Sequence, residues 1–279
     1  MSDRRFAVIG HPIGHTMSPF IHKRLFELAG LKGDYSVLDI APEELPAKME
    51  LLNALDGYNI TIPNKQRIIP FLDALDRRAE LYGSVNTVKN GEIRTGYTTD
   101  PAGFLKALSS AGIPLSGDVV IAGCGGAARI FAFEAALAGC RLTIAARPES
   151  AEKQQALALE LRQKLGAEKV SCCLLSEVEG EHDLFVNGTP LGMFPNTEGM
   201  AISARALSGF ANVFDAVYNP LETVLIKTAR ANGSRVCGGM PMLVWQAVAA
   251  HEIWDGTVYS VGDIEQLTED SAEEMKRKF

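Results

Sequence analysis

Val119-Val-Ile-Ala-Gly-Cys-Gly-Gly-Ala-Ala-Arg129 is the stretch of sequence that decides the fold. An apolar run of strand type leads into three glycines, and an apolar segment of helical period follows. Gly123 allows a tight turn, Gly125 lets the backbone approach a pyrophosphate, and the small Ala128 lets helix and strand pack closely. The stretch therefore predicts a dinucleotide-binding turn, and the alternative is a glycine-rich turn that binds nothing.

The next strand end indicates which dinucleotide is used. About 20 residues after such a turn, an acid would accept a hydrogen bond from the ribose 2′-hydroxyl of NAD, whereas an arginine would pair with the 2′-phosphate of NADP. The sequence here is Ala145-Ala-Arg-Pro148, with one arginine and no acid. NADP is favoured, NAD stays possible, and the alternative for Arg147 is an ordinary solvated side chain.

Apolar runs alternate with helical stretches on both sides of this turn, which is typical of βαβ units around a parallel sheet. A chain of 279 residues favours two domains at roughly 150 residues each. In the first part we expect strands at 6–10, 35–40, 58–62 and 93–98 with helices at 19–29, 43–54 and 66–75. From 119 onward we expect strands at 119–122, 142–146, 170–174, 184–187 and 213–217 with helices at 127–138, 151–165, 223–231 and 237–256. Residues 269–279 are expected to form a solvated, fraying helix.

Composition excludes several classes of function. A formal net charge of −7 argues against nucleic acid as a partner, because binding phosphates along a backbone needs clustered lysine and arginine. No apolar run approaches the roughly 20 residues that span a bilayer, and the N-terminus has no export signal. Five scattered cysteines indicate a reducing compartment, the cytoplasm, without disulfides or zinc. The five histidines lack metal-ligand spacing, so no metal is expected.

Four polar clusters follow predicted strands or lie in loops of the first part, at 15–19, 59–65, 85–87 and 97–100. Carboxyl ends of strands in an α/β sheet converge on a ligand crevice. Hydroxyls, amides, one lysine and one aspartate there would suit a polyhydroxylated small molecule that carries a carboxylate. Taken singly, Ser18 and Asp100 could be helix caps and Thr61 a strand former.

Eight ordered motifs resemble those of the shikimate dehydrogenase family and extend over nearly the whole chain. They are GHPIGHTMSP at 10–19, NITIPNK at 59–65, GSVNT at 83–87, GYTTD at 96–100, GCGGA at 123–127, NGTPLGM at 187–193, DAVYNP at 215–220 and MLVWQ at 242–246. The resemblance implies an enzyme that reversibly reduces 3-dehydroshikimate to shikimate with NADP, on the route to chorismate and the aromatic amino acids. It also implies a Rossmann-type NADP-binding domain at 101–236, and a second α/β substrate domain made of 1–100 and 237–279. The active site is expected in the cleft between them.

The resemblance also implies roles for individual residues. Lys65 and Asp100 take the positions of the catalytic pair. The substrate-binding positions fall on Thr16, Ser18, Asn59, Thr61, Asn86, Tyr218 and Gln246. The cofactor-binding positions fall on Gly123, Gly125, Gly126, Ala127, Arg147, Thr189, Ala216 and Gly239.

Three departures from the family pattern keep alternatives open. Thr16 replaces the usual serine, Ala146-Arg147-Pro148 replaces the commoner Asn-Arg-Thr, and the segment at 239–242 lacks a second glycine. One alternative is a quinate/shikimate or aminoshikimate enzyme with altered substrate or NAD preference. Another, of a different class, is a binding or sensor protein without catalysis. The expected partner is a small molecule, and the expected state is a monomer or homodimer.

Overall fold

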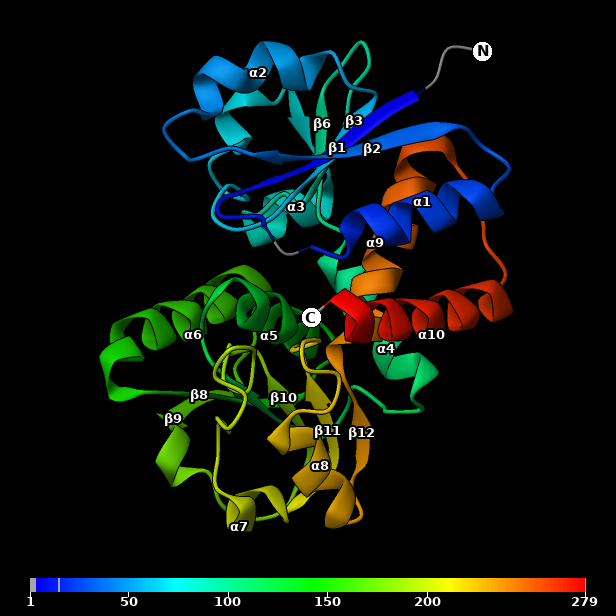
Figure 1. Ribbon diagram of the computed structural model, residues 1–279. Helices are drawn as coiled ribbons and strands as arrows, with labels where there is room; N and C mark the ends of the chain where they lie inside the picture. The colour runs from blue at the N-terminus through cyan, green and yellow to red at the C-terminus, as the bar shows by residue number, and fades with distance from the viewer. Residues whose placement is uncertain (1–3, 15, 279) are drawn as a thin grey trace. The chain divides into compact units, whose positions relative to one another are not determined.

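The computed structural model describes residues 4–14 and 16–278. The chain divides into two compact units (Figure 1). The first unit comprises Met1–Ala102 and Val244–Lys278, and the second unit comprises Gly103–Leu243. The helices α4 (Asp100–Ser110) and α9 (Gly239–Asp255) carry the chain from one unit to the other.

The first unit is built on a six-stranded mixed sheet with the strand order β2-β1-β3-β5-β6-β4. The strands β1, β2 and β3 are parallel, whereas β5 is antiparallel to both of its neighbours. The strands are β1 (Arg4–Gly10), β2 (Gly33–Asp39), β3 (Gly57–Ile60), β4 (Ala74–Leu75), β5 (Thr87–Lys89) and β6 (Thr95–Tyr97), and the helices wholly within the unit are α1 (Ser18–Leu28), α2 (Leu45–Asn53), α3 (Arg77–Tyr82) and α10 (Val261–Lys278).

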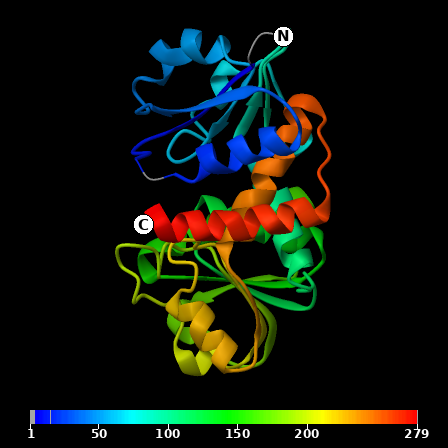
Figure 2. The same ribbon diagram turned by 45° about the vertical axis from the view of Figure 1, so that its right-hand side comes forward.

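Apolar side chains of β1 alternate between the two faces of this sheet, and both faces are covered by helices. Ala7 and Ile9 point into a core shared with α2 and α3, while Phe6 points into a second core with Phe26 of α1 and Trp254 of α9. Successive side chains of a strand face opposite ways, so a fully apolar strand requires cover on both sides. Figures 1 and 2 show α2 on one side of the sheet and α1 on the other.

The second unit has a wholly parallel sheet with the order β12-β11-β10-β7-β8-β9. Numbered within the unit, this is the 3-2-1-4-5-6 order of the dinucleotide-binding fold, and it reverses between β7 and β10. In Figure 1, α5 and α6 lie on one face of the sheet and α7 and α8 on the other. The strands are β7 (Asp118–Ala122), β8 (Arg141–Ala146), β9 (Val170–Leu174), β10 (His182–Asn187), β11 (Phe210–Asp215) and β12 (Arg235–Cys237), with helices α5 (Gly126–Leu137), α6 (Ala151–Leu165), α7 (Ala204–Leu207) and α8 (Val224–Ala231).

The expected α/β class with a Rossmann-type domain is confirmed, but the helix expected at 66–75 is wrong, and the C-terminal helix is longer and less solvated than expected. Residues 66–75 form a single 3-10 turn at Ile69–Phe71 and the short strand β4, because Pro70 and the loop geometry end the helical period early. The C-terminal helix is α10, which begins at Val261 and buries Ile264, Leu267 and Met275. It packs on α1 through an ion pair between Arg24 and Asp270 at 2.8 Å, so it is a docked amphipathic helix.

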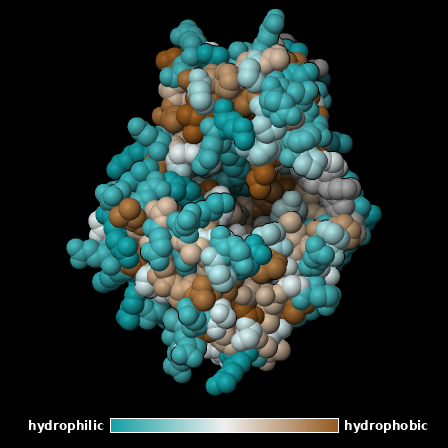
Figure 3. Space-filling view, turned by 90° about the vertical axis from the view of Figure 1, so that its left-hand side faces the viewer, coloured by the Kyte–Doolittle hydropathy of each residue, from teal (hydrophilic) through white to brown (hydrophobic). Residues whose placement is uncertain are grey.

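Polar residues dominate the surface that Figure 3 shows, in keeping with the acidic composition. Over residues 4–14 and 16–278, no helix is long and apolar enough to cross a membrane. All five cysteines are free thiols. The same described residues contain no group of three histidine, cysteine or acidic side chains that could hold a metal ion.

A pair of buried histidines joins α1 to α9 behind the first sheet. His22 Nδ1 lies 3.1 Å from His251 Nε2, and His251 Nδ1 lies 2.9 Å from the hydroxyl of Tyr259. Burial lowers the pKa of both histidines, and for His251 it lowers the pKa to about 4. Both imidazoles are therefore neutral in the folded protein at neutral pH.

We expect the free energy of unfolding to decrease as the pH falls from about 6.5 toward 4. In that window the unfolded chain takes up protons that the folded protein does not bind, and the slope is about 1.4 kcal/mol per pH unit for each histidine. Urea unfolding at a series of pH values measures this slope. His251→Asn should reduce the slope relative to wild type. An equal slope in wild type and His251→Asn would contradict the assignment.

Candidate active site and dinucleotide pocket

Lys65 and Asp100 form an ion pair in the first unit. Lys65 follows β3, Asp100 begins α4, and Lys65 Nζ lies 2.5 Å from Asp100 Oδ2. The backbone holds the lysine loop in place, because Val85 N–H donates to the Lys65 carbonyl and buried Asn64 donates its amide to the Ile40 carbonyl. The lysine side chain is 27% exposed and the aspartate 11%, so the pair faces solvent only in part.

Asn86 links this pair to other predicted substrate residues. Its amide nitrogen lies 2.9 Å from Asp100 Oδ1 and 3.2 Å from Gln246 Oε1 of α9. Its side-chain oxygen accepts a hydrogen bond from the Thr99 backbone at 2.8 Å. Asn59 also donates its amide to the Asn86 carbonyl at 3.3 Å. The structure thus brings Asn59, Gln246 and Asp100 together around Asn86.

The hydroxyl residues lie at the start of α1. Thr16 donates to Ser18 Oγ at 3.1 Å and accepts the Ser18 backbone N–H at 3.2 Å. Tyr35 of β2 is hydrogen bonded to Ser18 and donates to Asn59 Oδ1 at 2.7 Å, and burial raises the pKa of this phenol. Tyr35 was not predicted from the sequence, since one tyrosine in a strand carries no functional signal. Thr61 follows β3 directly and is half-buried.

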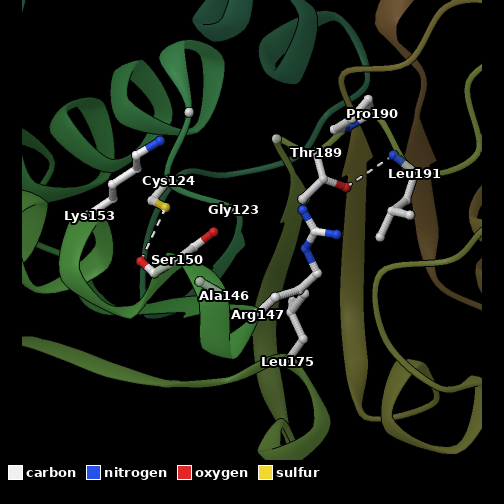
Figure 4. Close-up of a pocket in the computed structure, with 12 residues that line it drawn as sticks. Gly123, Cys124, Ala146, Arg147, Ser150, Lys153, Leu175, Thr189, Pro190 and Leu191 are labelled. Atoms are coloured by element: carbon white, nitrogen blue, oxygen red, sulfur yellow. Dashed lines mark hydrogen bonds between the residues drawn. The ribbon is translucent and has the colours of Figure 1, made fainter.

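The second unit has a pocket at the point where its strand order reverses. The pocket has a volume of about 260 Å³ (Figure 4). Gly123 adopts φ +99°, and a Cβ there would lie 3.0 Å from Thr189 Cγ2. The lining residues follow β7, β8, β9 and β10 or lie at the start of α6, and they are Gly123, Cys124, Gly125, Ala146, Arg147, Ser150, Lys153, Leu175, Gly188, Thr189, Pro190 and Leu191.

The glycine-rich turn leaves room for a ligand. A Cβ built on Gly125 or Gly126 would meet no described atom within 4 Å, and no described side chain caps the N-terminus of α5. Ala127 occupies the first turn of the helix. By contrast, a Cβ on Gly188 would lie 2.7 Å from Ala128 Cβ, so β10 and α5 touch where the small residue was predicted. Free N–H groups at a helix start favour a phosphate.

The other predicted cofactor residues follow β10 and β11 or begin α9. Thr189 donates its hydroxyl to Asn187 Oδ1 at 2.7 Å. A Cβ on Gly239 would lie 2.3 Å from the Ala216 carbonyl oxygen, so the two backbones are in contact there. Tyr218 belongs to this unit, and burial raises the pKa of its phenol.

A buried carboxylate that was not predicted organises this region. Asp215, at the end of β11, accepts hydrogen bonds from the Asn187 amide at 2.9 Å, the Val217 N–H at 3.1 Å and the Thr223 hydroxyl at 2.6 Å. Burial raises the pKa of Asp215, and the three donors oppose that shift. Thr223 also caps α8, and a threonine before an apolar helix is a signal that the sequence did contain.

The fold and these two sites define an α/β oxidoreductase that uses a nicotinamide dinucleotide. A family model described as the shikimate dehydrogenase substrate binding domain matches residues 8–88. The NADP(+)-dependent shikimate dehydrogenase of Moorella thermoacetica is 41% identical over 262 residues, which cover 90% of this chain and 87% of that protein. The chain belongs to the shikimate dehydrogenase family.

Two solved structures extend the comparison. Shikimate 5-dehydrogenase of Thermus thermophilus, in complex with NADP(H) and shikimate, has a TM-score of 0.86 and 33% identity, covering 96% of this chain and 99% of that one. Quinate dehydrogenase of Corynebacterium glutamicum, in complex with NAD, has a TM-score of 0.84 and 29% identity, covering 96% of this chain and 99% of that one. The fold is therefore shared by enzymes with different substrates and cofactors.

Thr223→Val should destabilise the protein by about 1.5–3 kcal/mol, because it leaves a buried carboxylate with one donor fewer and removes a helix cap. Urea unfolding at pH 7 measures the loss. Thr223→Ser keeps the hydroxyl and is the matched control, with a smaller expected loss. Equal stability of the valine variant and wild type would show that the Asp215 network contributes nothing.

Proposed function

We propose that this protein is an enzyme that interconverts shikimate and 3-dehydroshikimate by NADP-dependent hydride transfer, in the biosynthesis of chorismate and the aromatic amino acids. The Lys65–Asp100 pair, 2.5 Å apart among buried amides, carries this proposal together with membership of the family. The first unit is the substrate-binding and catalytic domain, and the second unit is the dinucleotide-binding domain. The free thiols support a reducing compartment, the cytoplasm.

The pocket of the second unit suits NADP. The open backbone at Gly125 and Gly126, the uncapped start of α5, and Arg147 at the end of β8 are the groups that would hold the phosphates. Gly123, Ala127, Thr189, Ala216 and Gly239 complete the proposed cofactor set. When bound, the nicotinamide supplies the hydride for reduction or accepts it for oxidation.

Lys65 stabilises the negative charge on the reacting oxygen and exchanges a proton with it. Reduction of a ketone leaves an alkoxide, and the Lys65 ammonium stabilises that oxygen and donates a proton to it. In the reverse direction the neutral amine accepts the proton of the alcohol. Asp100 holds the lysine in position and keeps a negative charge beside the ammonium, while Asn86 fixes the second carboxylate oxygen.

The remaining polar residues bind the substrate. Thr16 and Ser18 present hydroxyls for the carboxylate, and Tyr218 makes a further contact with it. The amides and hydroxyls of Asn59, Thr61, Asn86 and Gln246 bind the ring hydroxyls or shape the pocket around them. The protein's own hydrogen bonds orient the Asn59 and Asn86 side chains, so the positions of their polar atoms are set before a substrate binds.

A second candidate within the family has a specific observation behind it. Thr16 places a methyl group at the carboxylate position, where the family pattern has serine, and the related quinate dehydrogenase shares the fold. The alternative is an enzyme for quinate or aminoshikimate, or one that uses NAD. A sensor without catalysis has no chemical need for the Lys65–Asp100 pair.

One matrix of assays tests the proposal. Purified protein is incubated with shikimate or quinate and with NADP or NAD, and reduced nicotinamide is followed by its absorbance. We expect the fastest turnover with shikimate and NADP. Absence of reduced nicotinamide in all four combinations would overturn the enzymatic assignment, and a faster reaction with quinate or NAD would favour the second candidate.

Lys65→Ala should lower kcat by on the order of 10² to 10⁴, because general acid–base catalysis at the reacting oxygen is lost. Circular dichroism and urea unfolding check that the variant stays folded. Lys48→Ala, on the exposed face of α2, is the matched control and should keep the wild-type kcat. A folded Lys65→Ala variant with unchanged kcat would remove Lys65 from the mechanism.

Thr16→Ser should shift the preference toward shikimate, because removing the methyl group restores the hydroxyl arrangement of the family pattern. The measurement is the ratio of kcat/KM for shikimate and quinate in variant and wild type. An unchanged ratio would show that position 16 does not set the preference.

A further inference from the structure

We propose that Thr87 is a positioning residue, which holds the Asn59 and Asn86 side chains in one orientation before the substrate binds. Thr87 begins β5 and is the last residue of the GSVNT motif, in which the proposed function uses only Asn86. The inference rests on the proposed function, because that proposal makes Asn59 and Asn86 substrate-binding residues. Thr87 itself is 0% exposed, so it acts on a substrate through its neighbours.

Strand pairing places the Thr87 hydroxyl beside Asn59. The two residues lie directly opposite each other in the antiparallel pair of β3 and β5. Side chains of opposite residues share one face of the sheet, with Cβ atoms about 4.5–5.5 Å apart, so a short hydroxyl and an amide can meet. Asn59 Nδ2 donates to Thr87 Oγ1 at 3.0 Å. The contact follows from the sheet itself and is present in the protein without substrate.

The Thr87 hydroxyl also reaches Asn86. Thr87 Oγ1 donates to Asn86 Oδ1 at 3.2 Å while it accepts the Asn59 amide. A hydroxyl has one hydrogen to donate, and Thr87 donates it to Asn86. The hydrogen bonds therefore run in one direction, from the Asn59 nitrogen through the threonine hydroxyl to the Asn86 oxygen. At the end of this series, Asn86 Nδ2 donates to Asp100 Oδ1 at 2.9 Å.

This direction determines which end of each amide faces which partner. The oxygen of an asparagine side chain accepts hydrogen bonds and its nitrogen donates them, so the partners select one of two orientations. Asn59 has a donor at its oxygen, the Tyr35 hydroxyl at 2.7 Å, and an acceptor at its nitrogen, the Thr87 hydroxyl. Without that hydroxyl, the nitrogen would still donate to the Asn86 carbonyl, at the longer distance of 3.3 Å. Asn86 depends on Thr87 less, because its oxygen also accepts the Thr99 backbone N–H at 2.8 Å.

Loss of the Thr87 hydroxyl should therefore weaken substrate binding more than it slows the chemical step. The Asn59 side chain would be less restrained, and the entropy lost in ordering it would oppose binding. Thr87 takes no part in the Lys65–Asp100 ion pair or the hydrogen bond from Asn86 to Asp100, so general acid–base catalysis should continue. A merely structural role would act differently, because a smaller folded fraction lowers the apparent kcat and leaves KM unchanged.

Steady-state kinetics on Thr87→Val test this inference, because valine keeps the branched shape and strand propensity of threonine without the hydroxyl. We expect the KM for shikimate to rise about three- to tenfold, as for one neutral hydrogen bond, with kcat within about twofold of wild type and an unchanged KM for NADP. Thr95→Val is the matched control on the neighbouring strand β6 and should behave like wild type, since Thr95 is not a partner in any of these hydrogen bonds.

A second pair of variants keeps the test decisive if valine prevents folding. Thr87→Ser and Thr87→Ala both lack the methyl group and differ only in the hydroxyl. The serine variant should stay within about twofold of the wild-type KM for shikimate, and the alanine variant should have the higher KM. A double-mutant cycle with Asn59→Ala identifies the route, because removal of the hydroxyl should raise KM less once the Asn59 side chain is absent.

The outcomes separate this inference from the proposed function. An equal KM for shikimate in Thr87→Val and wild type, or in the alanine and serine variants, would overturn the inference and leave the proposed function intact. An equal rise in KM with and without the Asn59 side chain would also overturn it, because the effect would not pass through Asn59. Wild-type protein that does not oxidise shikimate would contradict the proposed function and, with it, the inference.

Discussion

The organisation of the first unit depends on the hydrogen bonds that the Asp100 carboxylate accepts. One of its oxygens accepts from Lys65 and the other from Asn86, so a single group connects the loop after β3, the segment before β5 and the start of α4. A charged hydrogen bond to a carboxylate is about twice as strong as a neutral one. The lysine therefore has one preferred position before any substrate arrives, and the amides around it are already oriented.

The sequence predicted those features of the fold that depend on a short stretch of chain or on the regular alternation of strands and helices. The glycine-rich turn between an apolar strand and an apolar helix specified the second unit, and the arginine after β8 was visible by its spacing. The strand β5, which pairs with β6 in a hairpin, was missed, because a strand of three residues is too short to show alternation. The Asn90-Gly91 pair between them was the available signal.

The sequence predicted the residues of the candidate site. It did not predict the residues that hold them in place. Motif resemblance pointed to Lys65, Asp100 and Asn86, which the fold does bring together. Tyr35 and Asp215 were out of reach, because each acts through neighbours that are distant in sequence. Tyr35 reaches Asn59 across 24 residues, and Asp215 reaches Asn187 across 28. Contacts of this kind arise from sheet order, which a single sequence does not display.

The glycines of the second unit are held by different constraints. Gly188 must stay small because the protein itself occupies the space beside it, where Ala128 lies. Gly125 and Gly126 have empty space beside them, so folding alone would accept a larger side chain at either position. In a descendant that no longer needed a dinucleotide, these two positions would be free to drift while Gly188 stayed glycine. The order in which such glycines are lost could therefore record when a lineage gave up its cofactor, even where the fold had survived intact.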